Sequence, residues 1–359
     1  MIVSRSLRIF LTIMLIPLIY LSSVRFVSQL FFFTGKRTLY ENENVFRPPS
    51  SQTLSAKRNI LSFLVYLDPL YPEYHYLLAR QVFFQDIKRA EDLTIKTLRL
   101  SPIDPEYWTF YGWIKTTEGQ LQEGYKAFLK AIELNPGRPG SYIQQALFLN
   151  YILPLMDANG RSLYKVIIDL DLQIARNLDI KFFLQNPYVY LVAAANAAYS
   201  NDRKTALEWL NRIPDSFLTD WQFILQVWAL YFQLGSSYRP IAHFSQLLNN
   251  NKLTIEQLNY IEREIKTRYK ASGFRYILAQ IYIFKGDIEQ AEKELIALNS
   301  QQNFAEYKIL LASIYEKQGR FQEAFRLYQQ AMELSPSNQI AKKKVIEYYS
   351  KGFKGRLAK

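Results

Sequence analysis

The feature that most constrains the fold of this chain is a 34-residue segment that occurs twice with the same pattern. Residues 105–138 read PEYWTFYGWIKTTEGQLQEGYKAFLKAIELNPGR, and residues 305–338 read AEYKILLASIYEKQGRFQEAFRLYQQAMELSPSN. Each contains an amphipathic helical stripe, a glycine at its fifteenth position (Gly119 or Gly319), a second stripe, and a proline that stops the second helix. A fixed period of this length indicates stacked helix pairs rather than two or three globular domains.

Further copies extend the array in both directions. Residues 71–104 directly precede the first copy in the same register, and residues 272–304 precede the second but are one residue short. Residues 187–222 are a more degenerate copy, and residues 55–69 resemble a second helix alone. Several copies in phase are a strong signal, whereas one would be weak.

Two intervening stretches are longer than the period. Residues 139–186 are broken by the sequence DANG at 157–160. Residues 223–271 have room for an extra helix that begins at Thr254, because Gln257 follows three residues later in a capping-box pattern. We therefore treat 139–271 as the degenerate part of the array.

The pattern resembles the tetratricopeptide repeat, a helix-turn-helix unit of 34 residues. The matching family positions are Trp108, Gly112, Phe128, Ala131 and Pro136 in the first copy, and Ala312, Tyr315, Ala324, Tyr328, Ala331 and Pro336 in the second. The resemblance implies an all-α fold, a right-handed α-solenoid, over residues 54–338. Lys115 and Gly124 depart from the family, which has tyrosine and alanine at these positions.

The resemblance also implies a binding surface, because in this family the concave face of the first helices receives an extended peptide or a helix. The residues at the matching positions include His75, Phe83, Trp113, Thr116, Tyr199, Tyr276, Gln280, Phe284 and Lys317. This set is aromatic, carries little charge, and lacks the lysine and asparagine clamp with which some relatives hold a peptide carboxylate. We expect a protein or peptide ligand with apolar anchors. The alternative is that half of these aromatic residues only pack between repeats.

The net charge of +12 is concentrated at the two ends of the chain. Residues 1–50 contain six basic and two acidic side chains, and residues 339–359 contain seven basic and one. A nucleic-acid-binding domain is expected to have basic charge on its folded body, so no nucleic-acid partner is predicted. Residues 339–359 are expected to form a capping helix with a basic tail. The alternative is that the basic ends bind anionic lipid or polysaccharide.

The capping helix is expected to bury one apolar face. The residues assigned to that face are Ile340, Val345, Ile346 and Tyr349, with lysines on the remaining sides.

The N-terminal sequence predicts a membrane anchor. A short basic tail, residues 1–8, precedes an apolar segment at 9–33, in which Arg25 is placed toward one interface. A polar linker follows at 34–53. A cleaved signal and a segment buried against protein remain alternatives. The short leading tail favours a periplasmic body, although basic residues on both sides leave the cytoplasmic face open.

Candidate catalytic and metal-binding residues are few. The chain has no cysteine, and its two histidines, His75 and His243, have no ligand or triad partners at helical spacing. Phosphate-binding and dinucleotide-binding glycine motifs are absent from the sequence. No catalytic, cofactor or metal site is therefore predicted, and the chain is not expected to be an enzyme.

The acidic residues of the degenerate region also have a simple interpretation. Asp157 and Asn159 lie in a segment that lacks the spacing of a calcium loop. Asp169, Asp171 and Asp179 are interpreted as a solvated face. The function predicted from the sequence is a membrane-anchored protein-interaction scaffold, in bacterial envelope or polysaccharide assembly.

Overall fold

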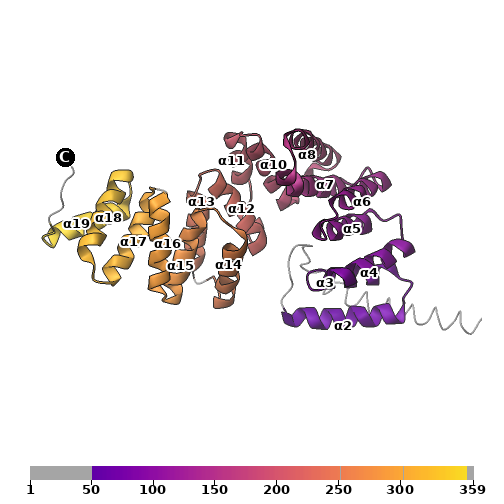
Figure 1. Cartoon of the computed structure of the whole chain (residues 1–359), viewed down its shortest axis with the longest axis horizontal. Coiled ribbons are helices and arrows are strands. Elements are labelled where there is room, and N and C mark those ends of the chain that lie inside the picture. The colour runs from indigo at the N-terminus through magenta and orange to yellow at the C-terminus, as the bar shows by residue number, and fades with distance from the viewer. Residues whose placement is uncertain (1–50, 251, 302, 354–359) are drawn as a thin grey trace, which may run out of the picture. The chain divides into compact units, whose positions relative to one another are not determined.

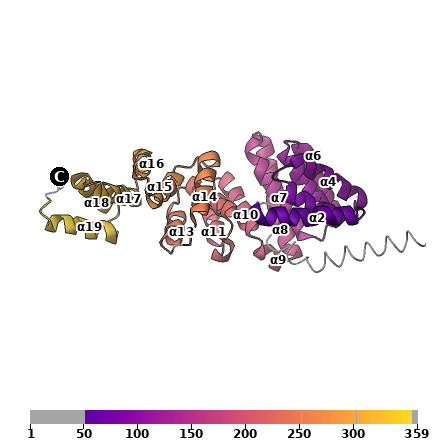
Figure 2. The ribbon, with the colours of Figure 1, turned by 90° about the horizontal axis from the view of Figure 1, so that it is seen from below.

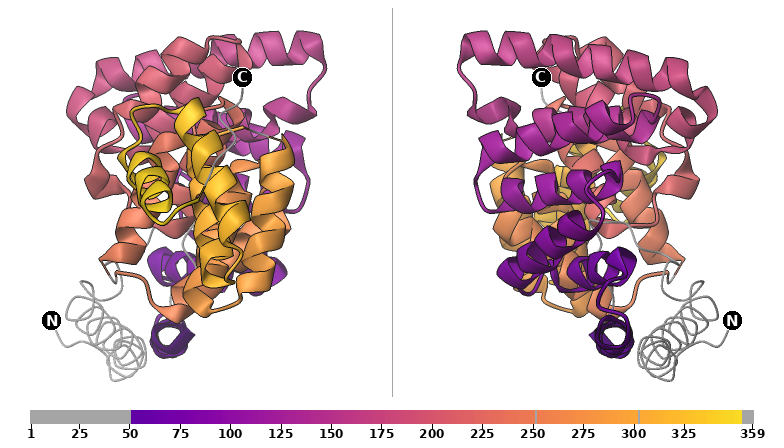
Figure 3. Two further views of the ribbon diagram at one scale, coloured as in Figure 1. Left: turned by 90° about the vertical axis from the view of Figure 1, so that its left-hand side faces the viewer. Right: turned by 90° about the vertical axis from the view of Figure 1, so that its right-hand side faces the viewer.

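The computed structural model describes residues 51–250, 252–301 and 303–353. Within these ranges the chain forms eighteen α-helices and two short 3-10 helices, with no strand (Figure 1). Figure 2 and Figure 3 show the same helices from other sides. The predicted anchor at 9–33 and nearly all of the predicted linker lie outside the described residues. No helix in the ranges given above is both long and apolar enough to cross a bilayer.

The chain divides into two compact units, and the division falls between Ile213 and Pro214. The helices of unit 1 are α2 (Ser51–Leu67), α3 (Pro72–Val82), α4 (Ile87–Leu100), α5 (Pro105–Thr117), α6 (Leu121–Leu134), α7 (Pro139–Ile152), η1 (Leu153–Leu155), α8 (Ala158–Leu178), α9 (Ile180–Gln185), α10 (Pro187–Tyr199) and α11 (Arg203–Asn211). Its helix pairs are α3 with α4, α5 with α6, α7 with α8, and α10 with α11.

Unit 2 has the same construction at its C-terminal end. Its helices are η2 (Asp215–Phe217), α12 (Trp221–Gln233), α13 (Tyr238–Asn249), α14 (Ile255–Arg268), α15 (Gly273–Lys285), α16 (Ile288–Gln301), α17 (Ala305–Lys317), α18 (Phe321–Leu334) and α19 (Gln339–Ser350). Helix α15 pairs with α16 and α17 pairs with α18, while α19 packs against α18.

The turns inside three of the helix pairs, α5–α6, α15–α16 and α17–α18, depend on glycine. Gly119, Gly286 and Gly319 have φ angles of 80°, 83° and 76°, in the left-handed region that side chains with a Cβ rarely adopt. Gly119 and Gly319 are the glycines at the fifteenth position of the repeat, which explains why that position is glycine in both copies.

The two helices of the pair α5–α6 approach closely because small residues face each other. A Cβ placed on Gly124 would lie 2.8 Å from Thr116 Oγ1 and 3.0 Å from the carbonyl oxygen of Gly112. A Cβ on Gly112 would lie 3.0 Å from the ring of Phe128. The departure from alanine at Gly124 is therefore explained, because Thr116 occupies the space that a methyl group would need.

Lys115, the other departure from the family, is a buried cation held by two acids. It is 5% exposed. Its ammonium group pairs with Glu91 of α4 and, at 3.0 Å, with Glu118 at the end of its own helix. A buried charge needs such partners. The pair with Glu91 joins one repeat to the preceding one.

The degenerate region contains the extra elements that its length indicates. Thr254 Oγ1 accepts a hydrogen bond from the Gln257 amide at 3.2 Å, and Gln257 Oε1 accepts one from the Thr254 amide at 2.9 Å. This confirms the predicted capping box, which begins α14. Asp157 accepts a hydrogen bond from the Gly160 amide at 2.7 Å and begins α8, so the DANG sequence separates α8 from η1.

The interpretation of Asp169, Asp171 and Asp179 as a solvated face is wrong for Asp171. This residue is 4% exposed, and its Oδ2 has no hydrogen-bond partner in the described residues. It lies on the side of α8 that also buries Ile168 and Ala175, whereas Asp169 and Asp179 are exposed. Burial raises the pKa of Asp171 to about 7.

The predicted apolar face of the capping helix is also wrong in most of its members. Helix α19 buries Ala341, Val345 and Tyr348, which have the i, i+4, i+7 spacing of one helical stripe. Of the four predicted residues only Val345 is buried, and Ile340 and Ile346 are both 59% exposed. The buried face is therefore not the predicted one but the face that carries Tyr348, which packs against Phe325 with ring centroids 5.4 Å apart.

Substituting Asp171→Asn is expected to stabilise the protein at neutral pH. The raised pKa means that the folded state keeps a proton that the unfolded state releases above about pH 4. Stability is therefore highest below the unfolded pKa and falls as the pH rises through about 7. The variant should raise the midpoint of thermal unfolding by about 5 °C at pH 8 and change it little at pH 4.

Thermal unfolding followed by circular dichroism over this pH range measures the effect. Asp92→Asn, an exposed substitution on α4, is the matched control. A gain of the same size at pH 4 and pH 8 would contradict the assignment.

Candidate functional site

The predicted groove residues lie on the first helices of the repeats, and each unit is described by itself. In unit 1 they are His75 and Phe83 at α3, Trp113 and Thr116 on α5, and Tyr199 on α10. In unit 2 they are Tyr276, Gln280 and Phe284 on α15, and Lys317 on α17.

The two residues at α3 are enclosed. His75 is 1% exposed, and its Nε2 lies 2.8 Å from the carbonyl oxygen of Pro69 in a hydrogen bond. Burial lowers the pKa of His75, which favours the neutral ring. The Phe83 ring lies 5.5 Å from that of Phe110 on α5. Both side chains therefore pack between helices and present little surface to a ligand.

The two residues on α5 are enclosed as well. Trp113 Nε1 donates to Gln144 Oε1 of α7 at 2.8 Å, and its indole meets the Phe128 ring edge to face at 5.3 Å. Thr116 Oγ1 donates to the carbonyl oxygen of Gly112 at 2.7 Å. The contacts of Trp113 join α5 to α6 and to α7, and that of Thr116 lies within α5. On α10, by contrast, Tyr199 remains exposed.

Unit 2 presents a more accessible surface on α15 and α17. Tyr276 is buried beside Tyr307, with ring centroids 5.3 Å apart, which joins the two helices. Gln280 is partly exposed and donates from Nε2 to Ser245 Oγ at 2.8 Å. Phe284 is 47% exposed, and Lys317 is exposed.

The groove positions of unit 2 recur every four residues on both α15 and α17. Gln280 and Phe284 follow Tyr276 at i+4 and i+8 along α15, and Ile309, Ser313 and Lys317 have that spacing along α17. Phe284 and Lys317 occupy the same position in consecutive repeats. We call Gln280, Phe284, Ile309, Ser313 and Lys317 the α15–α17 row. It combines apolar surface, hydrogen-bonding groups and one cation, and Lys317 forms no ion pair within the part of the chain that the structure describes.

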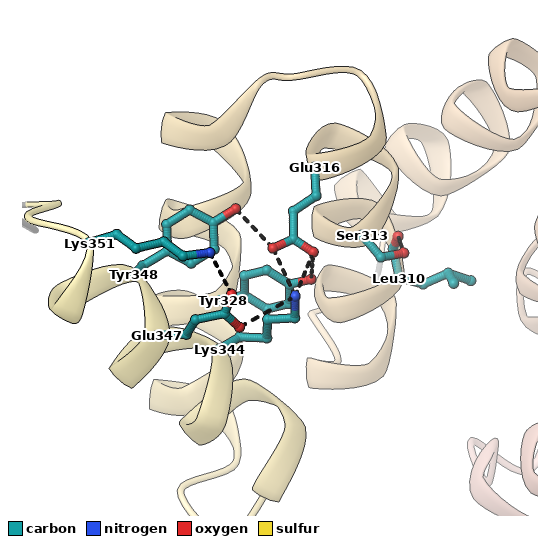
Figure 4. Close-up of polar contacts among 8 residues, drawn as sticks. All are labelled: Leu310, Ser313, Glu316, Tyr328, Lys344, Glu347, Tyr348 and Lys351. Carbon is teal, nitrogen blue, oxygen red and sulfur yellow. Dashed lines mark hydrogen bonds and ion pairs between the residues drawn. The ribbon is translucent and has the colours of Figure 1, made fainter.

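A polar cluster holds the C-terminal end of α17, where Lys317 lies. The Glu316 carboxylate pairs with Lys344 Nζ at 3.0 Å and accepts hydrogen bonds from the hydroxyls of Tyr328 at 3.0 Å and Tyr348 at 2.9 Å (Figure 4). Burial, together with the nearby Glu316 carboxylate, raises the pKa of both tyrosines. The cluster joins α17, α18 and α19.

Sequence reasoning did not identify this cluster. Its members come from three helices, and the only local signal is the spacing of Lys344 and Tyr348, which puts them on one face of α19. In Figure 4, Glu316 points toward α19 from the helix that also carries Ser313.

The two histidines belong to different units, His75 to unit 1 and His243 to unit 2. His243, on α13, meets the Trp228 ring edge to face at 5.7 Å, and burial lowers its pKa. In the ranges that the structure describes, no group of three histidine, aspartate or glutamate side chains could hold a metal ion.

Family profiles place this chain beside known repeat proteins. Two profiles described as tetratricopeptide repeat match residues 305–338, and residues 105–138 and 273–298. These matches confirm tetratricopeptide repeats at the two clearest copies and in the repeat formed by α15 and α16. Together with the described helices they establish an all-α helical-repeat fold.

Solved structures similar to this chain include a tetratricopeptide repeat protein from Parabacteroides merdae, with 13% identity and a TM-score of 0.43 over 82% of this chain and 98% of that one. Human IFIT1, solved as a dimer with m7Gppp-AAAA, has 13% identity and a TM-score of 0.48 over 80% and 68% of the two chains. Pseudomonas aeruginosa pilF has 14% identity and a TM-score of 0.44 over 67% and 97%. A search of the curated proteins finds no match.

Substituting Glu316→Gln is expected to loosen α19. The variant keeps the shape of the side chain but removes the charge that Lys344, Tyr328 and Tyr348 share, at a cost of about 1.5 to 3 kcal/mol. Hydrogen exchange of the α19 amides should become faster.

Glu333→Gln, an exposed substitution on α18, is the matched control and should leave α19 unchanged. Equal exchange rates in wild type and Glu316→Gln would show that the cluster does not hold the helix.

Proposed function

We propose that this chain is a protein-interaction scaffold whose ligand lies on the α15–α17 row. Tetratricopeptide repeats generally bind protein partners, and this row lies on the two repeats matched at 273–298 and 305–338. The observation that carries the proposal is the exposure of Phe284, 47%, together with a lysine at the same position of the next repeat, Lys317, that the described part of the chain leaves without an ion pair. Large apolar side chains that remain exposed at such a position are typical interface anchors.

The chemistry of the row defines the ligand that it fits. Phe284 and Ile309 offer apolar contact, and the Ser313 hydroxyl offers a hydrogen bond, whereas Gln280 is bonded to Ser245 and its Oε1 is buried. Lys317 offers a cation for a carboxylate. The expected ligand is therefore an extended or helical segment with an apolar side chain close to an acidic one. The buried residues His75, Trp113 and Thr116 would support the fold rather than contact this ligand.

Photo-crosslinking tests the proposal. A photoreactive phenylalanine analogue at position 284 should crosslink to a specific protein in cells of the source organism. The same analogue at Phe321, which is 49% exposed on a second helix, should not. A peptide from the crosslinked segment should bind about tenfold more weakly to Phe284→Ala, as expected for an interface anchor. Equal crosslinking at both positions, or unchanged affinity in the variant, would contradict the proposal.

We also propose that the scaffold is held at a membrane by residues 9–33, with its body on the periplasmic side. The proposal rests on the apolar sequence of that segment and on the basic tail at 1–8. The short polar linker would keep the helical repeats close to the bilayer. An envelope assembly is the setting that this arrangement fits.

Extraction and protease protection test the anchor. The full chain should stay in the membrane fraction at alkaline pH, and a chain without residues 1–33 should be soluble. Protease added to spheroplasts should digest the body. Protection of the body with an intact anchor would place it in the cytoplasm and overturn the proposed orientation.

The alternative function, binding of anionic lipid or polysaccharide by the basic ends, receives less support. Lys344 of α19 pairs with Glu316, and Lys351, directly after α19, pairs with Glu347 at 2.6 Å, so the charge of these two lysines is partly neutralised within the chain.

A further inference from the structure

Helix α2, the first described helix of unit 1, exposes an apolar face. Its inner side packs against α3, and Figure 1 shows it at the edge of the unit, with α3 and α4 on one side of it. Ile60, Phe63, Tyr66 and Leu70 lie on the outer side, and each is more than half exposed. Tyr66, at 82%, is the most exposed large hydrophobic side chain among the described residues. We call these four residues the α2 face.

The register of the repeat shows that this face is unusual within the chain. Pro69 follows α2 at the spacing at which Pro136 follows α6, so Phe63 and Tyr66 occupy two defined positions of a second helix. At these positions the clear repeats carry polar or charged residues: Lys96 and Arg99 on α4, Lys130 and Glu133 on α6, and Gln330 and Glu333 on α18. All six are at least partly exposed. Aromatic residues therefore stand on α2 where these other second helices present polar side chains to water.

Ile60 is exposed for a different reason. The residues at its position on α4 and α6, Leu93 and Ala127, are partly or fully buried. Each of those second helices is paired with a first helix of its own unit, whereas α2 has none among the described residues. The sequence before α2 does not supply one, because residues 34–50 are mostly polar and contain two consecutive prolines. No helix of the described chain therefore covers the α2 face.

The chain that precedes α2 indicates what covers the face. The apolar segment at 9–33, proposed above as a membrane anchor, ends at Phe33, and α2 begins at Ser51. A coil of the intervening residues spans about 23 Å on average. An anchor in the bilayer would therefore hold α2 within reach of the lipid headgroups.

The charges beside the face suit an anionic lipid surface. Helix α2 contains Lys57 and Arg58 and no acidic residue, and α4 contains four basic and two acidic residues. Burial and the nearby Lys96 of α4 lower the pKa of His75, whose ring is bonded to Pro69 just beyond α2, so Lys96 lies close to that end. Basic residues attract anionic headgroups, and aromatic residues favour the membrane–water interface. A second copy of α2 would instead bring like charges together.

We propose that the α2 face lies in the bilayer interface, with Phe63 and Tyr66 among the lipid headgroups and Lys57 and Arg58 beside anionic ones. The helix lies parallel to the membrane plane, with its apolar side chains buried about 5 to 10 Å deep at the boundary of headgroups and acyl chains. The inference rests on the proposed anchor and adds a second contact. The anchor alone would leave the first repeat free to turn on its linker, whereas the two contacts together hold it against the bilayer.

Fluorescence quenching by spin-labelled lipids tests the contact. The chain has no cysteine, so Asn59→Cys, one helical turn before Phe63 on the same side of α2, gives a single site for a bimane label. The full chain is reconstituted in vesicles of phosphatidylcholine and phosphatidylglycerol, with or without lipids that carry a nitroxide near the headgroup end of the acyl chain. The label should lose about half of its fluorescence in the nitroxide vesicles, as expected for burial at that depth. The matched control is Lys126→Cys, exposed at the same repeat position of α6, which should lose little.

A double substitution tests the aromatic residues. Phe63→Lys with Tyr66→Glu introduces the residues that α6 has at these two positions, so both are compatible with the repeat. Quenching of the label at position 59 should fall to the level of the Lys126→Cys control, because the face loses its apolar side chains. An unchanged midpoint of thermal unfolding establishes that the variant is folded. A label at Leu18→Cys, within 9–33, reports the anchor separately and should be quenched with either version of α2.

The two labels distinguish failure of the contact from failure of the anchor. Quenching at position 18 without quenching at position 59 would overturn this inference and leave the anchor intact. Quenching at position 59 alone would support the α2 contact and contradict the anchor, and quenching at neither position would overturn both. A label at position 59 that is shielded from water but not quenched by the lipids would show that a second copy or another protein covers the face, which overturns the inference. Undiminished quenching in the double variant would overturn it as well.

Discussion

The fold depends on the distance at which two antiparallel helices can pack, and this distance is set by the smallest side chains on their facing sides. In α5 and α6 those residues are Gly112 and Gly124, with Thr116 filling the space between them. Close backbone approach allows Phe128 to be fully buried, and Phe128 in turn supports Trp113. Stacking of such pairs then encloses the first helices on several sides.

This enclosure explains why the family positions for a groove are not all surface in this chain. His75, Phe83, Trp113, Thr116 and Tyr276 are buried, and Phe284 and Lys317 are not. A position in a repeat specifies which way a side chain points. Whether it reaches solvent depends on the neighbouring helices, such as α7, whose Gln144 binds the indole of Trp113.

Much of the fold could be predicted from the sequence, because helical periodicity and the residues of turns and helix caps are local signals. The glycine turns, the capping box at Thr254 and the start of α8 after Asp157 are all of this kind. What could not be predicted depends on tertiary contacts. Asp171 was predicted to be solvated because charged residues lie near it in the sequence. Only the packing of α8 against its neighbours buries it. The Glu316 cluster unites side chains of α17, α18 and α19, so spacing along the chain indicates only its pair Lys344 and Tyr348.

Lys115 has a consequence for how consecutive repeats are joined. It is buried and pairs with Glu91, which the preceding repeat supplies. In the later copy the corresponding residue is Tyr315, and Arg320 lies over its ring at 3.8 Å from the centroid. Glu292, which occupies the position of Glu91 in the repeat before Tyr315, pairs with Arg320 at 2.7 Å. The same acidic position therefore binds a cation of the following repeat in both places, so the junction keeps its charge pairing while the residue that supplies the cation changes.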